Sequence, residues 1–547
     1  MKDTKQNNYL VQGSILAFSS IISRFIGMLY RIPLTNIVGD VGMGYYSSAY
    51  ELYNLALILS SYSIPTAVSK LVSSMESKKQ YRNAHQVFLC SLKIASAVGL
   101  LMSLFVYAFA GVWASMVKSA PVAIPLRVLS PTIFVFAVMG VFRGYFQGKH
   151  TMVPTALSQL IEQMVNAVAS VLAAYRLMQE HNASVDMEAY GAAGGTFGSF
   201  AGAVFGLVTL LGVYAMNYAF IKKRVKLDRK SRPKGTAEIT RMLVLTVIPI
   251  ILSQTIYQLS GTVDNTVFGQ VMDGVVGEDA AFLWGIYSNK YRMLTNLPVA
   301  IATALGTSIV PALANTYAIG DDDGVRDKIA SSVKFNMLIA IPAAVGMAVL
   351  AEPIIMALFP STETELSARL LQVGSIAIVF FAYSTLTNGI LQGIDRMRLP
   401  VLNAAFSLVF HVVVLFVLLK VFNMAVYGLV LGNITYALGV CALNWAGIRK
   451  HAYYRQEIRT TFLMPSLCAA IMGAASYLTY HGIYGLTARN LPALIAAIGF
   501  ALICYCALLV VTRTVSEEEL RGFPKGHALV RFLRRLHLLP KEDNRIK

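Results

Sequence analysis

Residues 491–511 read LPALIAAIGFALICYCALLVV, a stretch without a charged side chain that is long enough to cross a membrane as one helix. A helix of about 20 apolar residues spans the roughly 30 Å of hydrocarbon in a bilayer. Similar stretches recur along the whole chain of 547 residues, of which 56% are hydrophobic and 14% charged, with a mean hydropathy of +0.60. The sequence therefore predicts an all-α integral membrane protein, because helices satisfy their own backbone hydrogen bonds in lipid.

The apolar stretches predict about 14 membrane spans, separated by charged loops or by loops marked with glycine and proline. The predicted spans lie near residues 9–35, 42–73, 84–112, 120–147, 152–178, 192–220, 239–270, 280–311, 328–351, 366–393, 399–421, 426–448, 459–482 and 489–513. Some of them exceed the thickness of a bilayer, which indicates tilt or ends that extend into water.

Short motifs recur in the two halves of the chain. Residues 144–148 (GYFQG) end the fourth predicted span, and residues 389–393 (GILQG) end the tenth. Tyr46 of the second span has a counterpart in Tyr287 of the eighth, and each is followed by a serine and then by a second tyrosine. These matches predict two pseudo-symmetric six-helix lobes plus two C-terminal helices, with the substrate bound between the lobes.

Five segments are expected on this basis. They are residues 1–221, the N-terminal lobe; 222–238, a basic cytoplasmic linker; 239–450, the C-terminal lobe; 451–513, two further spans; and 514–547, a cytoplasmic amphipathic tail. In the tail, Leu529, Phe532 and Leu533 share a helical face opposite several arginines, which is typical of a helix lying on an anionic leaflet.

The net charge of +18 has a topological explanation. The basic residues collect in alternate loops, as expected for cytoplasmic loops of a membrane protein, so no nucleic acid partner is predicted. The same alternation places both termini in the cytoplasm. The first apolar stretch is too long for the core of a signal peptide, and we expect the first span to be retained.

Ionisable side chains inside the predicted spans are the candidate functional residues. They are Arg24, Arg31, Glu51, Glu162, Asp264, Lys290 and Arg292. Each charge at the centre of a bilayer costs at least about 2.5–3.5 kcal/mol, so these groups are expected to face a cavity or a partner rather than lipid.

Three of these residues are arginines. Arg24 and Arg31 are seven residues apart, so a straight helix would return both to nearly one face, and Arg292 could add a third cation. Guanidinium matches phosphate oxygens through paired hydrogen bonds, which predicts a diphosphate-binding set. The alternative is that the arginines form structural or gating ion pairs, Arg24 with Asp264 and Arg292 with Glu51.

The remaining polar residues are expected to line the cavity or to act in gating: Glu51, Glu162, Asn166, Asp264 and Lys290. Glu162 and Asn166 are one helical turn apart and can present polar groups together. The alternative is that they only satisfy neighbouring helices through interhelical hydrogen bonds. The five cysteines lack the spacing of a metal site, and neither a metal, a cofactor nor a catalytic residue is predicted.

At these residues the chain resembles the multidrug/oligosaccharidyl-lipid/polysaccharide exporter superfamily, and within it the polysaccharide-biosynthesis or lipid II flippase branch of Gram-positive bacteria. The resemblance rests on residues 23–27 (SRFIG) with Arg31, on residues 38–46 (VGDVGMGYY), on residues 64–70 (IPTAVSK) and on the GYFQG motif. It implies a fourteen-span fold and a central cationic cavity that opens to each side in turn.

The resemblance also implies that arginines of spans 1 and 8 engage a lipid-linked diphosphate, and Arg24, Arg31 and Arg292 match those positions. Two residues depart from the pattern. Ser63 stands where a glycine often precedes the proline motif, and Glu51 stands where a lipid II flippase can have a basic residue.

The leading hypothesis is therefore a flippase, not an enzyme, in the bacterial cytoplasmic membrane. It would move an undecaprenyl-diphosphate-linked saccharide, with lipid II as the first candidate, to the outer leaflet by alternating access. It is expected to work as a monomer among membrane lipids, coupled to the membrane potential or to a Na⁺ or H⁺ gradient.

Two rival functions remain open. A cation-coupled multidrug exporter of the same superfamily would need an acidic cavity, for which Glu51, Glu162 and Asp264 are available. A membrane glycosyl ligase or polymerase belongs to another class, and would normally need a sizeable external loop with catalytic groups.

Overall fold

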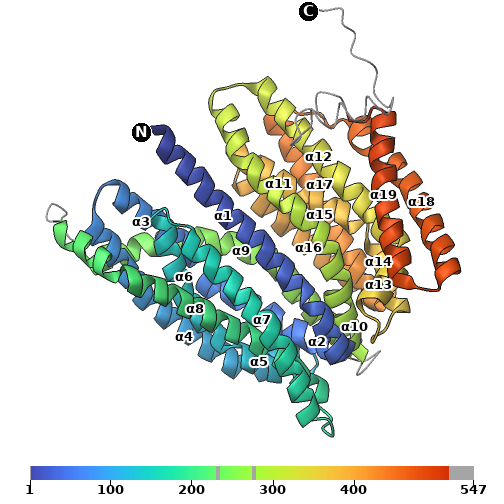
Figure 1. Ribbon diagram of the computed structural model, residues 1–547, viewed down its shortest axis with the longest axis horizontal. Helices are drawn as coiled ribbons and strands as arrows, with labels where there is room; N and C mark the ends of the chain where they lie inside the picture. The colour runs from blue at the N-terminus through green and yellow to red at the C-terminus, as the bar shows by residue number, and fades with distance from the viewer. Residues whose placement is uncertain (1, 229–233, 274–278, 516–547) are drawn as a thin grey trace, which may run out of the picture. The chain divides into compact units, whose positions relative to one another are not determined.

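The computed structural model describes residues 2–228, 234–273 and 279–515, and in these ranges every regular element is a helix (Figure 1). The predicted all-α class is confirmed. The amphipathic tail expected at 514–547 lies almost entirely outside the described residues, as does the middle of the linker expected at 222–238.

Internal contacts divide the chain into two compact units. Unit 1 comprises Met1–Asn289 with Phe416–Val426, and unit 2 comprises Lys290–Leu415 with Tyr427–Lys547. Helix α9, which we expected in the C-terminal lobe, groups with unit 1 by these contacts. The five expected segments stay a prediction.

Unit 1 contains the helices of the first half of the chain. They are α1 (Lys2–Leu29), α2 (Arg31–Leu57), the π-helix η1 (Ile58–Tyr62), α3 (Ser63–Ser77), α4 (Tyr81–Met116), the 3₁₀-helix η2 (Ala120–Val122), α5 (Ala123–Leu129), α6 (Pro131–Gly148), α7 (Val153–Glu180), α8 (Met187–Leu227), α9 (Thr236–Met272) and α10 (Asp279–Gly285). The π-helix η3 (Ile286–Tyr291) contains the boundary between the units.

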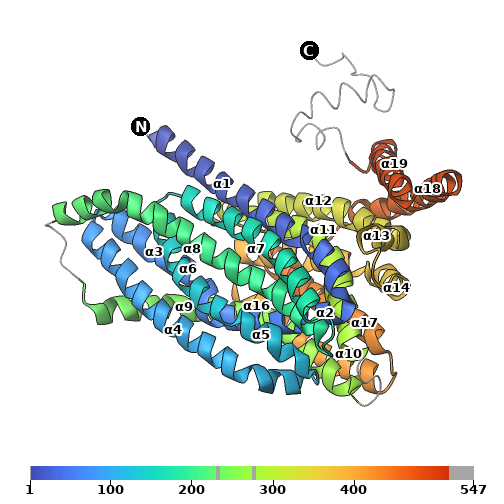
Figure 2. The same ribbon diagram turned by 60° about the horizontal axis from the view of Figure 1, so that its bottom comes forward.

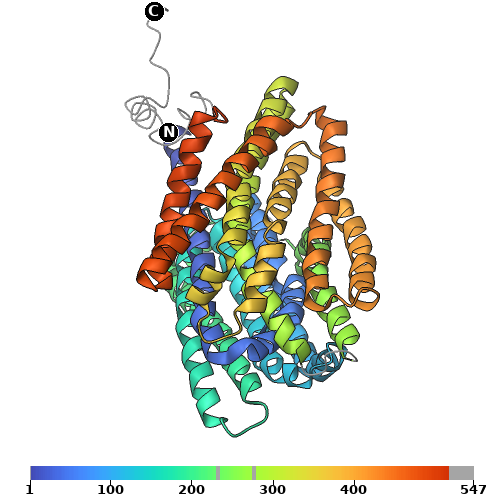
Figure 3. The same ribbon diagram turned by 90° about the vertical axis from the view of Figure 1, so that its right-hand side faces the viewer.

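Unit 2 contains the remaining helices, although the end of α16 and the start of α17 (Phe416–Val426) group with unit 1. They are α11 (Arg292–Ala318), α12 (Asp322–Val349), α13 (Ala351–Leu358), α14 (Glu365–Gly374), α15 (Ala377–Gly393), α16 (Arg398–Lys420), α17 (Ala425–Ala452), the π-helix η4 (Arg459–Leu463), α18 (Met464–Thr487) and α19 (Asn490–Val511). The last two pack against each other as an antiparallel pair (Figure 3).

Eleven helices of the described ranges are long and apolar enough to cross a membrane, or twelve if the bent pair α14 and α15 forms one span. One of the eleven is the continuous stretch Phe18–Ser77, which covers both the first and the second predicted span. The chain is thus a multi-pass membrane protein, while the exact number of fourteen spans stays a prediction.

One interruption shapes the first 77 residues. Helix α1 ends at Leu29 and α2 begins at Arg31, but Tyr30 between them keeps helical dihedrals (φ −69°, ψ −21°) and hydrogen bonds of the i→i−4 type, so the helix continues through it. Inside α2, Gly39 has φ 77° and ψ 172°, a backbone conformation open to glycine and strained for other residues. The chain therefore bends at Gly39, within the loop that the sequence predicts between its first two spans.

The recurring glycine motif makes the same backbone contact in each unit. A Cβ atom added to Gly144 on α6 would lie 2.6 Å from the carbonyl oxygen of Pro65 on α3. In unit 2, a Cβ on Gly389 of α15 would lie 2.5 Å from the carbonyl oxygen of Gly306 on α11. The number of residues between Pro65 and Gly306 equals the number between Tyr46 and Tyr287, so Pro65 and Gly306 occupy equivalent positions in the two halves of the chain. The shared contact supports the predicted internal repeat. In both units a glycine lets two helices approach closely, as is common in lipid.

Candidate functional site

One face of α7 carries polar side chains at successive helical turns. We call Gln159, Glu162, Asn166 and Ser170 the polar column. Residues three or four apart lie on one face of a helix, and in unit 1 this helix packs against α8, α1 and α2 (Figure 2). The column is therefore turned toward other helices of its own unit.

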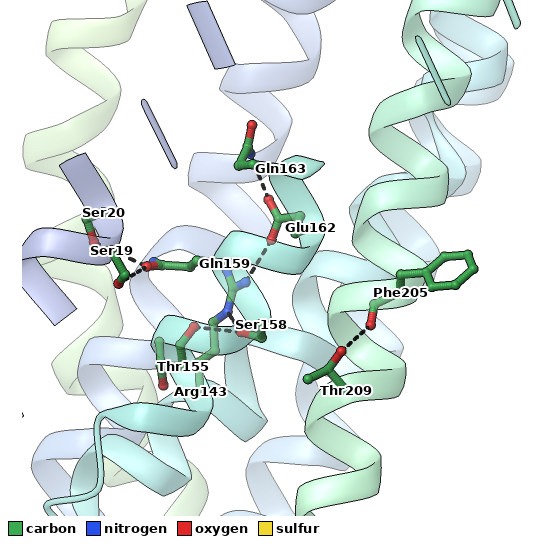
Figure 4. A network of polar contacts seen from close by, with 10 residues as sticks. All are labelled: Ser19, Ser20, Arg143, Thr155, Ser158, Gln159, Glu162, Gln163, Phe205 and Thr209. Carbon is green, nitrogen blue, oxygen red and sulfur yellow. Dashed lines mark hydrogen bonds and ion pairs between the residues drawn. The ribbon is translucent and has the colours of Figure 1, made fainter. Parts of the chain in front are cut away.

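Glu162 forms an ion pair inside the column. Its Oε2 lies 2.7 Å from Nη2 of Arg143 on α6, and the two side chains are only 9% and 12% exposed (Figure 4). Arg143 also donates from Nε to Ser158 Oγ at 3.0 Å, and Gln163 Nε2 donates to Glu162 Oε1 at 3.2 Å. Both carboxylate oxygens of Glu162 are thus engaged.

Arg143, which directly precedes Gly144 of the recurring motif, is not among the residues predicted from the sequence. A basic residue inside the apolar stretch 120–147 was the available signal. Since charges inside a span require a partner, it could have been matched with Glu162 of the next span.

Helix α1 contacts the polar column at Gln159, the first residue of the column. Ser20 Oγ donates to Gln159 Oε1 at 3.2 Å, with Ser19 at the longer distance of 3.5 Å (Figure 4). Arg24 lies on this helix, is exposed, and forms no ion pair with any residue that the structure describes. The expected pair of Arg24 with Asp264 is therefore absent from the described residues.

Arg24 and Arg31 lie about two turns apart on a nearly continuous helix. Arg24 belongs to α1 and Arg31 is the first residue of α2, and Tyr30 between them keeps helical dihedrals. Their joint action on one ligand stays a prediction.

Arg31 lies among three tyrosines of unit 1, Tyr30, Tyr46 and Tyr50, which we call the tyrosine cage. The guanidinium carbon is 5.6 Å from the ring centroid of Tyr46 and 5.9 Å from that of Tyr50. These are cation–π distances. The Nε of Arg31 is buried without a hydrogen-bond acceptor, and Arg31 forms no ion pair within the described part of the chain.

The phenol groups of the cage are tied to the polar column. Tyr30 and Tyr46 share a hydrogen bond of 2.9 Å between their hydroxyls, and Asn166 Nδ2 reaches the Tyr30 hydroxyl at 3.5 Å. The Tyr50 hydroxyl bonds Ser199 Oγ, which in turn donates to Asn166 Oδ1 at 3.2 Å. Asn166 therefore forms interhelical hydrogen bonds, as the alternative prediction for this residue stated. These hydrogen bonds hold the tyrosine rings beside Arg31.

The other two acids among the predicted site residues, Glu51 and Asp264, lie on α2 and α9. Glu51 is buried and accepts a long hydrogen bond of 3.5 Å from Gln258 Nε2, and Gly261 packs directly against its carboxylate. Asp264 is buried on α9, beside Asn265, whose Oδ1 accepts from Ser48 Oγ at 3.2 Å. Neither acid is without a partner.

The two cations predicted on the eighth span fall in unit 2. Lys290 is completely buried and donates from Nζ to the carbonyl oxygen of Glu363 at 2.6 Å and to Ser367 Oγ at 3.1 Å. Arg292 is half-buried and opens α11. Lys290 thus stabilises its own unit, and the convergence of Arg292 with Arg24 and Arg31 stays a prediction.

Comparison with protein families gives two matches. The model of the family described as polysaccharide biosynthesis protein matches residues 10–317, and the model of the MatE family matches residues 249–417. Together they cover the first ten predicted spans and most of the eleventh.

Individual proteins resemble the chain along nearly its whole length. It is 27% identical over 543 residues to the uncharacterized membrane protein YabM of Bacillus subtilis, covering 97% of this chain and 98% of that protein. It is also 27% identical over 552 residues to the lipid II flippase MurJ of the same organism, covering 94% and 98%. A solved structure of a lipid II flippase MurJ in an inward closed conformation matches with a TM-score of 0.68 at 14% identity, over 91% of this chain and 98% of that one. The fold is therefore that of these transporters.

Proposed function

The chain belongs to the polysaccharide biosynthesis protein family, within the multidrug/oligosaccharidyl-lipid/polysaccharide exporter superfamily, and from this premise we propose that it flips an undecaprenyl-diphosphate-linked saccharide across the membrane. Lipid II is the first candidate, because it is the substrate named for MurJ relatives. The cargo would move from the inner to the outer leaflet by alternating access, without any bond being made or broken.

The observation that carries the proposal is Arg31 in its tyrosine cage. A guanidinium held by ring faces gains only about 0.5–2 kcal/mol from each contact, which leaves most of its charge uncompensated. A phosphate group would supply the missing counter-charge and accept paired hydrogen bonds from the same side chain. A neutral or cationic ligand would do neither, so the cage favours an anionic head group.

The proposal also covers the remaining candidate residues, the energy source and the topology in the membrane. Arg24 and Arg292 would join Arg31 on the diphosphate, with Lys290 and the buried acids in structural or gating roles. The membrane potential, worth about 2.3 kcal/mol per charge and 100 mV, or a Na⁺ or H⁺ gradient would give direction. We further propose a monomer in the bacterial cytoplasmic membrane with both termini in the cytoplasm.

A cation-coupled drug exporter is the second candidate, favoured by the MatE match over residues 249–417. The pairing of Glu162 with Arg143 removes one of the acids on which that candidate relied. The third expectation, a glycosyl ligase or polymerase, is wrong, because the matched relatives and the solved structure are transporters.

The test uses the purified full-length chain in liposomes. Fluorescent lipid II and a lipophilic cationic dye are offered separately, and their arrival in the opposite leaflet or lumen is measured with and without a membrane potential. The proposal predicts flipping of lipid II and no protein-dependent movement of the dye. Movement of the dye alone would overturn it in favour of the drug exporter.

A further inference from the structure

Glu162 is an acid close to the tyrosine cage. It precedes Asn166 by one turn of α7, about 6 Å along the helix axis, and Asn166 contacts Tyr30, the residue next to Arg31. A free carboxylate there would act on the Arg31 guanidinium through a protein interior that screens charges poorly. It would compete with any anionic ligand for the charge of Arg31.

The structure shows how that competition is prevented. The carboxylate of Glu162 is occupied on one oxygen by Arg143 and on the other by Gln163. Arg143 is itself fixed by Ser158, whose hydroxyl donates to the carbonyl oxygen of Thr155 (Figure 4). The acid and its partner form a neutral unit, while Arg31 keeps its charge.

We infer that Arg143 is a specificity-determining residue: by holding Glu162 in an ion pair, it keeps the site around Arg31 selective for anions. The inference rests on the proposed function, since it explains how that site rejects cations. Arg143 acts through Glu162 and need not touch the ligand. Without Arg143, the Glu162 carboxylate would weaken the attraction of Arg31 for anions and offer a negative charge to cationic amphiphiles.

The experiment measures binding to the purified full-length protein in nanodiscs at pH 8. The probes are a fluorescent short-chain prenyl diphosphate and the tetraphenylphosphonium cation. Arg143→Gln should bind the diphosphate about tenfold more weakly and the cation about tenfold more tightly, because it leaves an acid without its cationic partner near the site.

Two further variants separate charge from packing. Glu162→Gln should bind the diphosphate up to about tenfold more tightly, because Arg143 then adds its charge to that of Arg31. The double variant Arg143→Gln/Glu162→Gln should return to wild-type preference. Arg127 on α5 is the matched control, because it also faces a tyrosine ring, at 5.9 Å from Tyr107, outside the polar column. Arg127→Gln should leave both affinities unchanged.

Several results would overturn the inference. Equal losses in Arg143→Gln and the double variant would show a purely structural role, and unchanged or weaker diphosphate binding by Glu162→Gln would contradict it even if Arg143→Gln does not fold. Failure of the proposed function is a different outcome, since wild-type protein would then bind no diphosphate and Arg31 variants would change nothing.

Discussion

The recurring motif builds one helix contact in each unit, and the two contacts share their packing but not their polar chemistry. Gly144 brings α6 against α3, and Gly389 brings α15 against α11. The residue directly before each glycine differs. In unit 1 it is Arg143, which forms an ion pair with Glu162, and in unit 2 it is Asn388, which accepts a hydrogen bond of 2.8 Å from Asn444 Nδ2.

The contact in unit 2 is extended by neutral groups. Asn444 also donates to Thr387 Oγ1 at 3.0 Å, and its own Oδ1 accepts from Asn403 Nδ2 at 2.9 Å. An amide cluster stabilises helix packing in lipid but cannot discriminate ligands by charge. Both units therefore use the glycine contact to pack two helices together, whereas we assign charge selection to unit 1.

The largest expected effect comes from replacing the polar residue that precedes each of the two glycines. Arg143→Met leaves Glu162 buried without its partner and should lower the free energy of unfolding by about 3–5 kcal/mol. Asn388→Leu removes only neutral hydrogen bonds and should cost about 1–3 kcal/mol. Chemical denaturation in detergent, followed by helical circular dichroism, measures both. Equal costs would mean that the ion pair is energetically no different from the amide cluster.

Replacing the two glycines themselves should have a smaller effect on stability, and the effect should be similar in both units. Gly144→Ala and Gly389→Ala place a methyl group against a backbone oxygen that cannot rotate away, and each should cost about 1–3 kcal/mol. Gly111→Ala on α4 is the control, because no atom lies within 4 Å of its added Cβ, and it should be neutral or stabilising by up to about 1 kcal/mol. A loss confined to one of the two motif glycines would argue against equivalent contacts.

The sequence predicted helix positions well because apolar stretches and glycine breaks are local signals. The bend at Gly39 falls in the predicted loop, and the spacing of Glu162 and Asn166 correctly placed both on one buried face. Long-range partners were harder to predict. Nothing local to Glu162 identifies Arg143 as its partner; the only signal is that a charge inside the apolar stretch 120–147 requires a partner on some other helix.

The arginines show the same limit. The seven-residue spacing of Arg24 and Arg31 does not show that Arg24 is exposed while Arg31 lies beside tyrosine rings. The tyrosine cage is held by Asn166 and Ser199 from two other helices. Its assembly depends on tertiary packing, which residue spacing alone does not encode.

The smallest expected effects come from single hydroxyl groups. Tyr46→Phe removes the hydrogen bond to Tyr30 but keeps the ring beside Arg31, and Thr387→Val removes an acceptor of Asn444 in unit 2. Each should lower the free energy of unfolding by about 0.5–1.5 kcal/mol. Only Tyr46→Phe should also weaken binding of a prenyl diphosphate, by a few fold, because it loosens the cage. An equal binding defect in Thr387→Val would contradict the assignment of charge selection to unit 1.

The most direct measurement compares diphosphate binding by Arg31→Gln and Arg127→Gln, two substitutions that each remove a guanidinium from a tyrosine ring. Isothermal titration of the nanodisc-embedded protein with an undecaprenyl diphosphate lipid gives both affinities. Loss of a charge-assisted, paired contact predicts at least a tenfold weaker Kd for Arg31→Gln, with Arg127→Gln unchanged. Wild-type affinity in Arg31→Gln would contradict a site built on this arginine.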